Sequence, residues 1–195
     1  MEESEISRKC GSALLGVDEC LAPAVRFPRN VFVGPWGYYF FFDSDRIFES
    51  AFVNQVKMLL HIEGSSCACL VNLDASAETA SSHRRFFIDR STAPNSYKDF
   101  IKGERPGQGW IHSIDRFGCA SNLCQWAVYC ERGSEIAVIA IRSQFAFDRY
   151  SLPLSGLKAV RIRDAVSKPI SYGFSPEALS TEWRNMLIHE YDSVK

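Results

Sequence analysis

The sequence predicts a single α+β domain in which a mixed, mainly antiparallel sheet packs against two main helices. Two segments, residues 45–62 and 176–191, repeat their apolar side chains with the period of a helix. Two others, residues 67–73 and 136–141, are nearly continuous apolar runs, which is typical of strands covered on both faces. At 195 residues the chain has the length of one large domain, and nothing resembling a linker divides residues 25–195.

The first helix is predicted over residues 45–62. Ser44 or Asp45 can cap its beginning, and Gly64 stands where a helix C-cap is expected. The predicted apolar stripe consists of Phe48, Phe52, Val56, Leu59 and Leu60.

The second helix is predicted over residues 176–191. Ser175 can cap it, with Pro176 at the first helical position and Glu177 beside the positive end of the helix dipole. Its apolar stripe consists of Leu179, Trp183, Met186, Leu187 and Tyr191.

Two β-hairpins are predicted. The β-prone runs at residues 31–33 and 38–42 flank a turn with two glycines and a proline, which places Trp36 at the tip of the hairpin. The runs at residues 125–130 and 136–141 flank a second turn, whose glycine can adopt a positive φ.

Three shorter elements complete the predicted domain. Residues 85–88 suit an edge strand, and residues 97–102 suit a short helix. In residues 158–163, Val160 and Ile162 alternate with arginines, which predicts a strand with one buried and one wet face.

The N-terminal segment, residues 1–24, is predicted to be flexible, because it mixes acidic and small residues without a sustained period. A short helix over residues 13–21 is compatible with this. The acidic N-terminus lacks the positive charge of a signal peptide, and no run approaches the ~20 apolar residues of a membrane span. We therefore expect a cytoplasmic protein.

The seven cysteines are an odd number and follow no disulfide framework, so reduced thiols are expected. The pairs Cys67/Cys69 and Cys119/Cys124 could together offer four thiolates to zinc. Because Cys67 and Cys69 lie within an apolar run, buried thiols that fill the core are the favoured interpretation. The sequence also lacks a glycine-rich phosphate loop, and neither a metal nor a cofactor is predicted.

Two groups of side chains could carry chemistry of their own. Cys119 follows a glycine in a predicted turn, with His112 and Asp115 just upstream, which keeps open a small hydrolase or transferase that uses a Cys/His pair. The acidic run at residues 43–45, with Glu49, could hold a divalent metal or attract a basic partner. Acidic residues are also common at the beginning of a helix, and this simpler interpretation is favoured.

A basic and aromatic segment lies between residues 84 and 110, in a chain whose formal net charge is −1. Aromatic rings among Arg and Lys suit contact with an acidic protein or with a single-stranded nucleic acid. The alternative is a solvated rim whose aromatic rings point into the core. The residues predicted to bind a partner are Trp36, Arg84, Arg85, Arg90, Tyr97, Lys98, Lys102 and Arg105.

Without a catalytic, metal or cofactor signature, the composition favours a non-enzymatic protein-binding module over an enzyme. The specific hypothesis is an immunity-type inhibitor, of bacterial kind, that neutralises a toxin by occlusion. The Cys/His enzyme and a single-stranded nucleic-acid binder that uses residues 84–110 remain the alternatives. The near-neutral net charge makes nucleic acid the less favoured partner.

Overall fold

The fold is built on one six-stranded sheet. The computed structural model describes residues 2–74, 85–105, 109–142, 147–167 and 179–192. Within these ranges the strand order is β1-β6-β5-β4-β2-β3, and every neighbouring pair is antiparallel, which confirms the α+β class. The strands are β1 (Tyr38–Asp43), β2 (Cys67–Asn72), β3 (Arg85–Asp89), β4 (Arg116–Ser121), β5 (Trp126–Glu131) and β6 (Ile136–Ile141).

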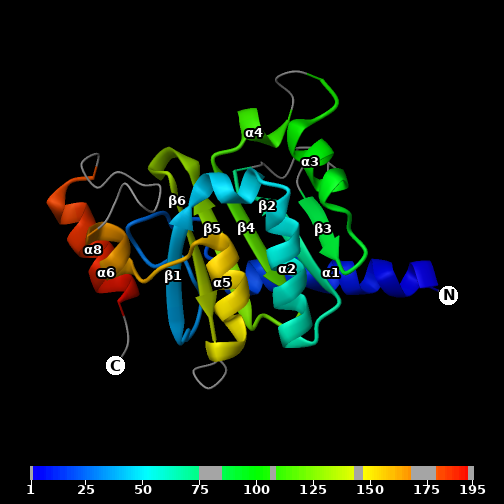
Figure 1. Cartoon of the computed structure of the whole chain (residues 1–195), viewed down its shortest axis with the longest axis horizontal. Coiled ribbons are helices and arrows are strands. Elements are labelled where there is room, and N and C mark those ends of the chain that lie inside the picture. Colours follow the sequence, from blue (N-terminus) through cyan, green and yellow to red (C-terminus); the bar gives the residue numbers. More distant parts are fainter. Residues whose placement is uncertain (1, 75–84, 106–108, 143–146, 168–178, 193–195) are drawn as a thin grey trace.

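Helices cover both faces of the sheet, so the molecule has three layers (Figure 1). None of the helices within the described ranges is long and apolar enough to cross a membrane. One face carries η1 (Ser44–Phe48), α2 (Ala51–Glu63), α3 (Pro94–Lys102), α4 (Trp110–Ser113), η4 (Phe147–Tyr150) and α5 (Ser151–Leu157), and the other carries α1 (Glu2–Cys20), α6 (Ile162–Ser167) and α8 (Thr181–Tyr191).

Each face of the sheet has its own apolar cluster, because side chains alternate along a strand. In β1, Phe40 and Phe42 belong to the cluster beneath α2 and α5, whereas Tyr39 and Phe41 belong to the cluster beneath α1, α6 and α8. All side chains of β6 are buried, and its neighbours are β1 and β5. This confirms the prediction of a central strand at residues 136–141.

The helix predicted over residues 45–62 is divided in two. The Asp43 carboxylate accepts a hydrogen bond from the Asp45 backbone N–H (2.8 Å) and so caps η1, and the extended backbone of Glu49 separates η1 from α2. The predicted end is confirmed, since Gly64 has a left-handed φ of 77° and its N–H bonds the carbonyls of Leu60 and His61.

The C-terminal helix α8 begins at Thr181. The Ser180 hydroxyl caps it by accepting a hydrogen bond from the Trp183 N–H at 3.2 Å. Leu187 and Tyr191 are its buried residues. The predicted cap and first turn at residues 175–177 lie outside the described residues.

One predicted hairpin is confirmed and the other is wrong. Strands β5 and β6 form the hairpin over residues 126–141, although Glu135 rather than the glycine of the turn has the positive φ (57°). The run at residues 38–42 pairs with β6, while Phe32 forms only an isolated bridge with Leu21. Because this run is apolar on both faces, it gains more burial beside β6 than in a two-stranded ribbon.

Two further segments differ from the prediction. Residues 158–163 do not form a strand: Val160 makes a single bridge to Phe41, and α6 begins at Ile162. Strand β4 was not predicted, because Gly118 and Cys119 within it resemble a turn. In the folded chain Gly118 leaves room for α1 and the residue after it, since a Cβ at this position would lie 3.0 Å from Val17 Cγ1 and 2.6 Å from Leu21 Cδ1.

The helix near the N-terminus is longer than the short helix over residues 13–21 that the sequence allowed. Residues Glu2–Cys20 form α1, and Ala13, Val17 and Cys20 are buried against the sheet. The close approach depends on Gly16, because a Cβ there would lie 2.3 Å from the Ser121 carbonyl oxygen. Small side chains that allow such proximity give a weak apolar period, which is why the sequence alone did not indicate a packed helix.

A partly buried carboxylate ties the end of α2 to the β4–β5 turn. Glu63 accepts hydrogen bonds from Ser121 Oγ (2.6 Å), Gln125 N (2.9 Å) and Trp126 Nε1 (3.1 Å). Burial raises the pKa of Glu63 above its ordinary value, and these hydrogen bonds only partly offset the effect.

The contact of α1 with the β4–β5 turn predicts opposite effects for two glycines of the same helix. Gly16→Ala should destabilise the fold by about 1–3 kcal/mol, since the new methyl group meets backbone. A Cβ at Gly11 would have no heavy atom within 4 Å, so Gly11→Ala should stabilise the fold by roughly 0.5–1 kcal/mol through helix propensity. Urea unfolding of both variants measures the difference, and equal effects would argue against the packing of α1.

The Glu63 network predicts a pH dependence. Because the folded pKa lies above the unfolded value, the folded state binds the proton more tightly, and this contribution to stability is complete at low pH and lost as the pH rises through the folded pKa. The stability of the native protein relative to Glu63→Gln should therefore decline over the pH range that lies above the ordinary pKa of a glutamate. Urea unfolding of both proteins across this range tests it; a relative stability that grows with pH contradicts the assignment.

Candidate functional site

Two of the residues predicted to contact a partner belong to the core. Trp36 is 8% exposed, donates from Nε1 to the Val33 carbonyl (3.0 Å) and lies beneath the Arg142 guanidinium. Tyr97 is fully buried, and its hydroxyl donates to the Ile47 carbonyl. This corrects the prediction for both: large aromatic side chains in this chain gain more from burial than they could offer at a surface.

The described cationic residues of the predicted segment are distributed over β3, the turn that follows it, α3 and the end of α3. Arg85 lies on β3 with its guanidinium over the Phe87 ring (5.5 Å), and Arg90 donates to the Ser65 carbonyl (3.4 Å). Lys98 and Lys102 lie on the exposed side of α3. Arg105 is exposed beyond the end of α3, and Arg84 lies outside the described residues.

The aromatic residues interleaved with these cations point inward. The Phe100 ring packs between Phe86 (4.6 Å between centroids) and Trp110 (4.8 Å), and Trp110 in turn contacts Phe117 (5.6 Å). The whole row belongs to the apolar cluster on the α2 face of the sheet. The alternative interpretation, aromatic rings in the core with cations at the rim, therefore describes this segment.

Lys98 and Lys102 nevertheless line a cleft, which we name the α3 cleft. Tyr97 and Ile101 anchor α3 to the core, and this turns the two lysines outward one helical turn apart. The opposite wall is the junction between η1 and α2. The cleft has a volume of about 360 Å³ and is lined by Phe48, Glu49, Ser50, Ala51, Lys98, Ile101, Lys102 and Ile111.

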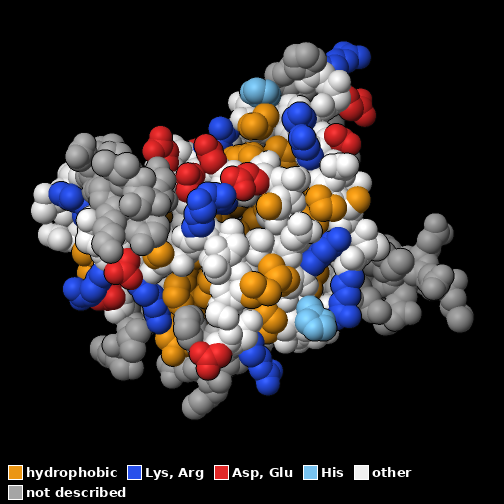
Figure 2. All heavy atoms as spheres, in the orientation of Figure 1, with side chains coloured by type: hydrophobic (Ala, Val, Ile, Leu, Met, Phe, Trp, Pro, Cys, Tyr) orange, Lys and Arg blue, Asp and Glu red, His pale blue; other side chains and the backbone are white. Residues whose placement is uncertain are grey.

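The α3 cleft combines an apolar floor with cations whose charge the described part of the chain does not neutralise. Among the described lining residues the only carboxylate is that of Glu49, and it is engaged by Arg46, whose Nη1 lies 3.1 Å from both oxygens. Across the described ranges, no carboxylate lies at ion-pair distance from Lys98 or Lys102. In Figure 2, apolar and basic side chains lie side by side over this part of the face, between η1 and α3.

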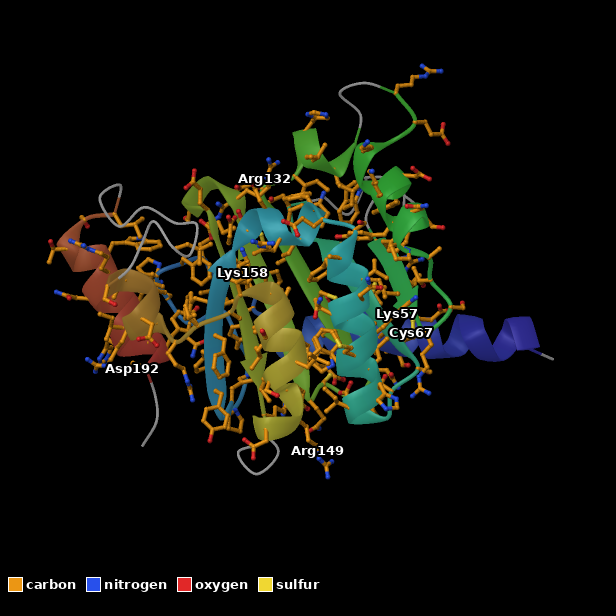
Figure 3. All side chains as sticks on the ribbon, in the orientation of Figure 1. Lys57, Cys67, Arg132, Arg149, Lys158 and Asp192 are labelled. Atoms are coloured by element: carbon orange, nitrogen blue, oxygen red, sulfur yellow. The ribbon has the colours of Figure 1, made fainter. Side chains whose placement is uncertain are left out.

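Arg132 adds a third cation at the edge of the α3 cleft. Its guanidinium lies 4.7 Å from the centroid of the Phe48 ring and donates to the Ile111 carbonyl at 2.6 Å. Both contacted residues line the cleft. Arg132 comes from the β5–β6 turn, at the same end of the sheet (Figure 3).

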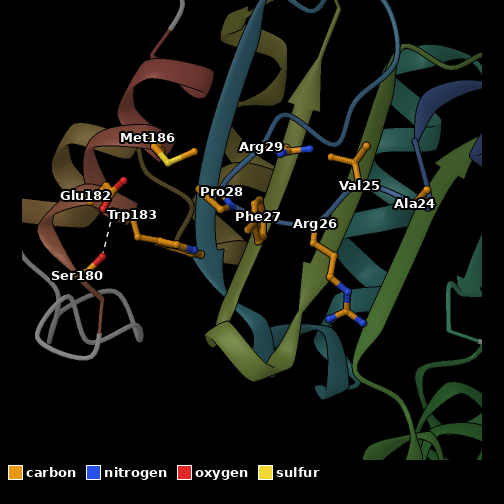
Figure 4. A pocket seen from close by; sticks show the side chains of 10 residues that line it. All are labelled: Ala24, Val25, Arg26, Phe27, Pro28, Arg29, Ser180, Glu182, Trp183 and Met186. Atoms are coloured by element: carbon orange, nitrogen blue, oxygen red, sulfur yellow. Dashed lines mark hydrogen bonds between the residues drawn. The ribbon is translucent and has the colours of Figure 1, made fainter.

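A second concave surface, the α8 pocket, lies between the loop after α1 and the first turns of α8 (Figure 4). Trp183 and Met186 project from α8 toward this loop. The pocket has a volume of about 580 Å³ and is lined by Ala24, Val25, Arg26, Phe27, Pro28, Arg29, Ser180, Glu182, Trp183 and Met186.

Three carboxylates of the protein surround Arg26, one of the two arginines that line the α8 pocket. Arg26 lies 3.2 Å from Asp115, 3.5 Å from Asp74 and 3.7 Å from Glu131. Arg116 pairs with the same Asp74 at 2.6 Å and donates to the backbone of the loop. This network fixes the loop on the ends of β2, β4 and β5. The other charged lining residues, Arg29 and Glu182, carry opposite charges, so the α8 pocket has less net positive charge than the α3 cleft.

Tyr191 fixes the same loop from α8. Its hydroxyl donates to the Arg29 carbonyl (2.8 Å) and accepts from the Val31 N–H (3.1 Å). Its ring packs edge-on against Phe27 and Phe41, and burial raises the pKa of its hydroxyl. The wall of the α8 pocket is thus part of the core on this side of the sheet.

The thiols are buried, as the favoured interpretation predicted; this holds for all six cysteines whose side chains are described. Cys67 and Cys69 belong to the cluster beneath α1, whereas Cys119 belongs to the cluster beneath α2. The sheet therefore separates the thiols that a four-cysteine zinc site would have to unite. Within the described residues, no three side chains of His, Cys, Asp or Glu are arranged to hold a metal ion.

The predicted Cys/His group is not brought together. Cys119 lies within β4 and not in a turn, is fully buried, and has a pKa that burial raises well above its ordinary value. His112 is exposed on α4. The Asp115 carboxylate is occupied by the Gly133 N–H (2.8 Å) and by Arg26.

The acidic run after β1 has structural partners. Asp43 caps η1, and Glu49 pairs with Arg46. These contacts support the simpler interpretation, in which the acidic side chains stabilise the beginning of a helical segment.

The burial of the thiols predicts slow alkylation. A thiol reacts as its thiolate, and burial disfavours that form, which raises the pKa of Cys20 to about 12 and holds the pKa of Cys119 well above its ordinary value. In the native protein, N-ethylmaleimide should label the six described cysteines only as the fold opens, and in concentrated guanidinium chloride it should label all of them at once. Mass spectrometry of the peptides measures both. Rapid native labelling of Cys119 would restore the Cys/His alternative.

Comparison with other proteins adds no relative from which a function could be carried over. No protein-family model matches the chain, and neither the curated proteins nor the solved structures contain a significant match to it. The functional argument for this protein therefore depends on its own geometry and charge.

Proposed function

We propose that this chain is a cytoplasmic, non-enzymatic protein-binding module whose partner docks in the α3 cleft. The observation that carries the proposal is the juxtaposition of an apolar floor with Lys98 and Lys102, neither of which has a counter-ion among the described residues. Protein interfaces combine an apolar centre with charged groups that orient the partner. The specific form proposed is a bacterial immunity-type inhibitor, which neutralises a toxin by occluding its active surface.

Inhibition by occlusion requires a surface that keeps its shape, because ordering a mobile segment would reduce affinity. The row of Phe86, Phe100 and Trp110 packs beneath α3, and Tyr97 and Ile101 anchor the helix itself. The other wall includes the first residues of α2, and the apolar side of this helix is buried in the same cluster. Both walls of the cleft are therefore supported by the core.

The positions of the chemically reactive groups favour binding over the Cys/His alternative. A catalytic thiol must reach a substrate and sit beside an imidazole. Cys119 is in the core, and His112 is on the surface. This separation supports a role in which the chain contributes a surface rather than a reaction.

The proposal predicts that reversing the two charges of α3 abolishes partner binding. Tagged full-length chain is purified from its native host and its partner is identified by cross-linking and mass spectrometry. Lys98→Glu/Lys102→Glu should lower the affinity for that partner by at least about tenfold, because two attractive contacts become repulsive.

Lys57→Glu/Lys158→Glu is the matched control, because it makes the same change of charge on α2 and at the end of α5, away from the cleft (Figure 3). It should bind as the native chain does. The absence of a stoichiometric protein partner, or equal loss in both double variants, contradicts the proposal.

A further inference from the structure

We infer that the part of the partner that enters the α3 cleft is an acidic segment in which an apolar side chain is flanked by carboxylates. This inference rests on the proposed function and specifies the chemistry of the partner. It follows from three features of the described lining: its uncompensated cations, its apolar floor, and the lack of an open aromatic ring.

The charges of the cleft favour carboxylates on the side of α3. Lys98 and Lys102 are separated by one helical turn, so their ammonium groups lie along the same wall. The opposite wall presents the Glu49–Arg46 ion pair, which is neutral as a unit. Two carboxylates of an incoming segment would thus find ammonium groups along the α3 wall, whereas Arg132 at the edge of the cleft already donates to the Ile111 carbonyl, and this gives the segment a defined orientation.

The floor favours an apolar side chain between these carboxylates. It is formed by the buried side chain of Ile101, the half-buried side chains of Phe48 and Ile111, and the exposed methyl group of Ala51. A volume of about 360 Å³ lies at the lower end of the range of ligand pockets, and it suits one or two side chains rather than a folded domain.

The same surface is poorly suited to a single-stranded nucleic acid, which needs exposed rings on which bases stack. The Arg132 guanidinium lies over the Phe48 ring (4.7 Å), and Phe117 contacts that ring edge-on (5.2 Å). Trp110 and Tyr97 are buried. In the described part of the cleft, a single-stranded nucleic acid could therefore contact the lysines but would find no exposed ring on which to stack its bases. An acidic peptide can contact both the lysines and the apolar floor.

Fluorescence anisotropy with a labelled peptide tests the inference on the full-length chain. The probe is a fluorescein-labelled peptide that repeats Glu-Leu-Glu, and the reference peptide carries Gln in place of Glu. The acidic probe should bind the native chain at least about tenfold more tightly than the reference, and raising the salt concentration should weaken it. Lys98→Glu/Lys102→Glu should remove this preference, and Lys57→Glu/Lys158→Glu should keep it.

A second variant tests the floor. Ala51→Glu places a carboxylate in the cleft, at the first position of α2, where an acidic residue favours the helix. The variant should fold as stably as the native chain, as measured by urea unfolding, and should bind the acidic probe at least about tenfold more weakly. Undiminished binding by Ala51→Glu would place the peptide outside the cleft and overturn the inference.

Other outcomes separate this inference from the proposed function. Equal binding of the two peptides overturns the inference. It is also overturned if a fluorescein-labelled oligothymidine binds more tightly than the acidic probe and the Lys98→Glu/Lys102→Glu variant no longer binds the oligothymidine. A native partner that needs both lysines but whose cross-linked segment lacks carboxylates also overturns it, while the proposed function stands. If the native chain has no protein partner, the proposed function itself fails, whatever the probe binds.

Discussion

The structure depends on the burial of β6. Every side chain of this strand is buried, on both faces of the sheet, so neither face can be left to solvent. Two helical layers are therefore required. Segments distant in sequence supply them: α2, α3 and α5 cover one face, while α1, α6 and α8, from the two ends of the chain, cover the other (Figure 1). The sheet also decides where the thiols lie, because the alternation along β2 and β4 places Cys69 and Cys119 in different clusters.

The α3 cleft results from the way in which the apolar cluster continues past β3 beneath α3 and α4. The row of aromatic rings from Phe86 through Phe100 and Trp110 to Phe117 extends the apolar cluster beneath α3 and α4. Once Tyr97 and Ile101 have joined this row, the period of the helix leaves Lys98 and Lys102 on the outside. Arginines close the edges of the core in a similar way, since the guanidinium of Arg132 covers the Phe48 ring. A rigid, cationic and partly apolar surface thus arises from ordinary core packing, and it gives the proposed binding role a physical basis.

Sequence reasoning anticipated part of this surface. The basic character of residues 84–105 drew attention to Lys98 and Lys102, which do line a cleft. Trp36 and Tyr97 were also assigned to the interface, although both are buried. The sequence of a loop or short helix does not show whether an aromatic side chain points toward the core or toward solvent. Nothing in the sequence indicated that η1 and the beginning of α2 form the opposite wall of the cleft. Phe48 and Ala51 line the cleft from either side of Glu49, where the backbone interrupts the helix that the apolar period predicted to be continuous.

The sequence by itself determined the features that are local in origin. These are the α+β class, the buried strands at β2 and β6, the β5–β6 hairpin, the left-handed end of α2 at Gly64, and the burial of the thiols. Periodicity, turn chemistry and hydrophobicity act over a few residues, so a single sequence can reveal them. Only the tertiary structure decided that β1 pairs with β6, that the small residues of α1 pack on β4, and that α3 faces the beginning of α2. Each of these depends on which distant surface gains most by being buried, and that free energy belongs to the assembled core rather than to any one segment.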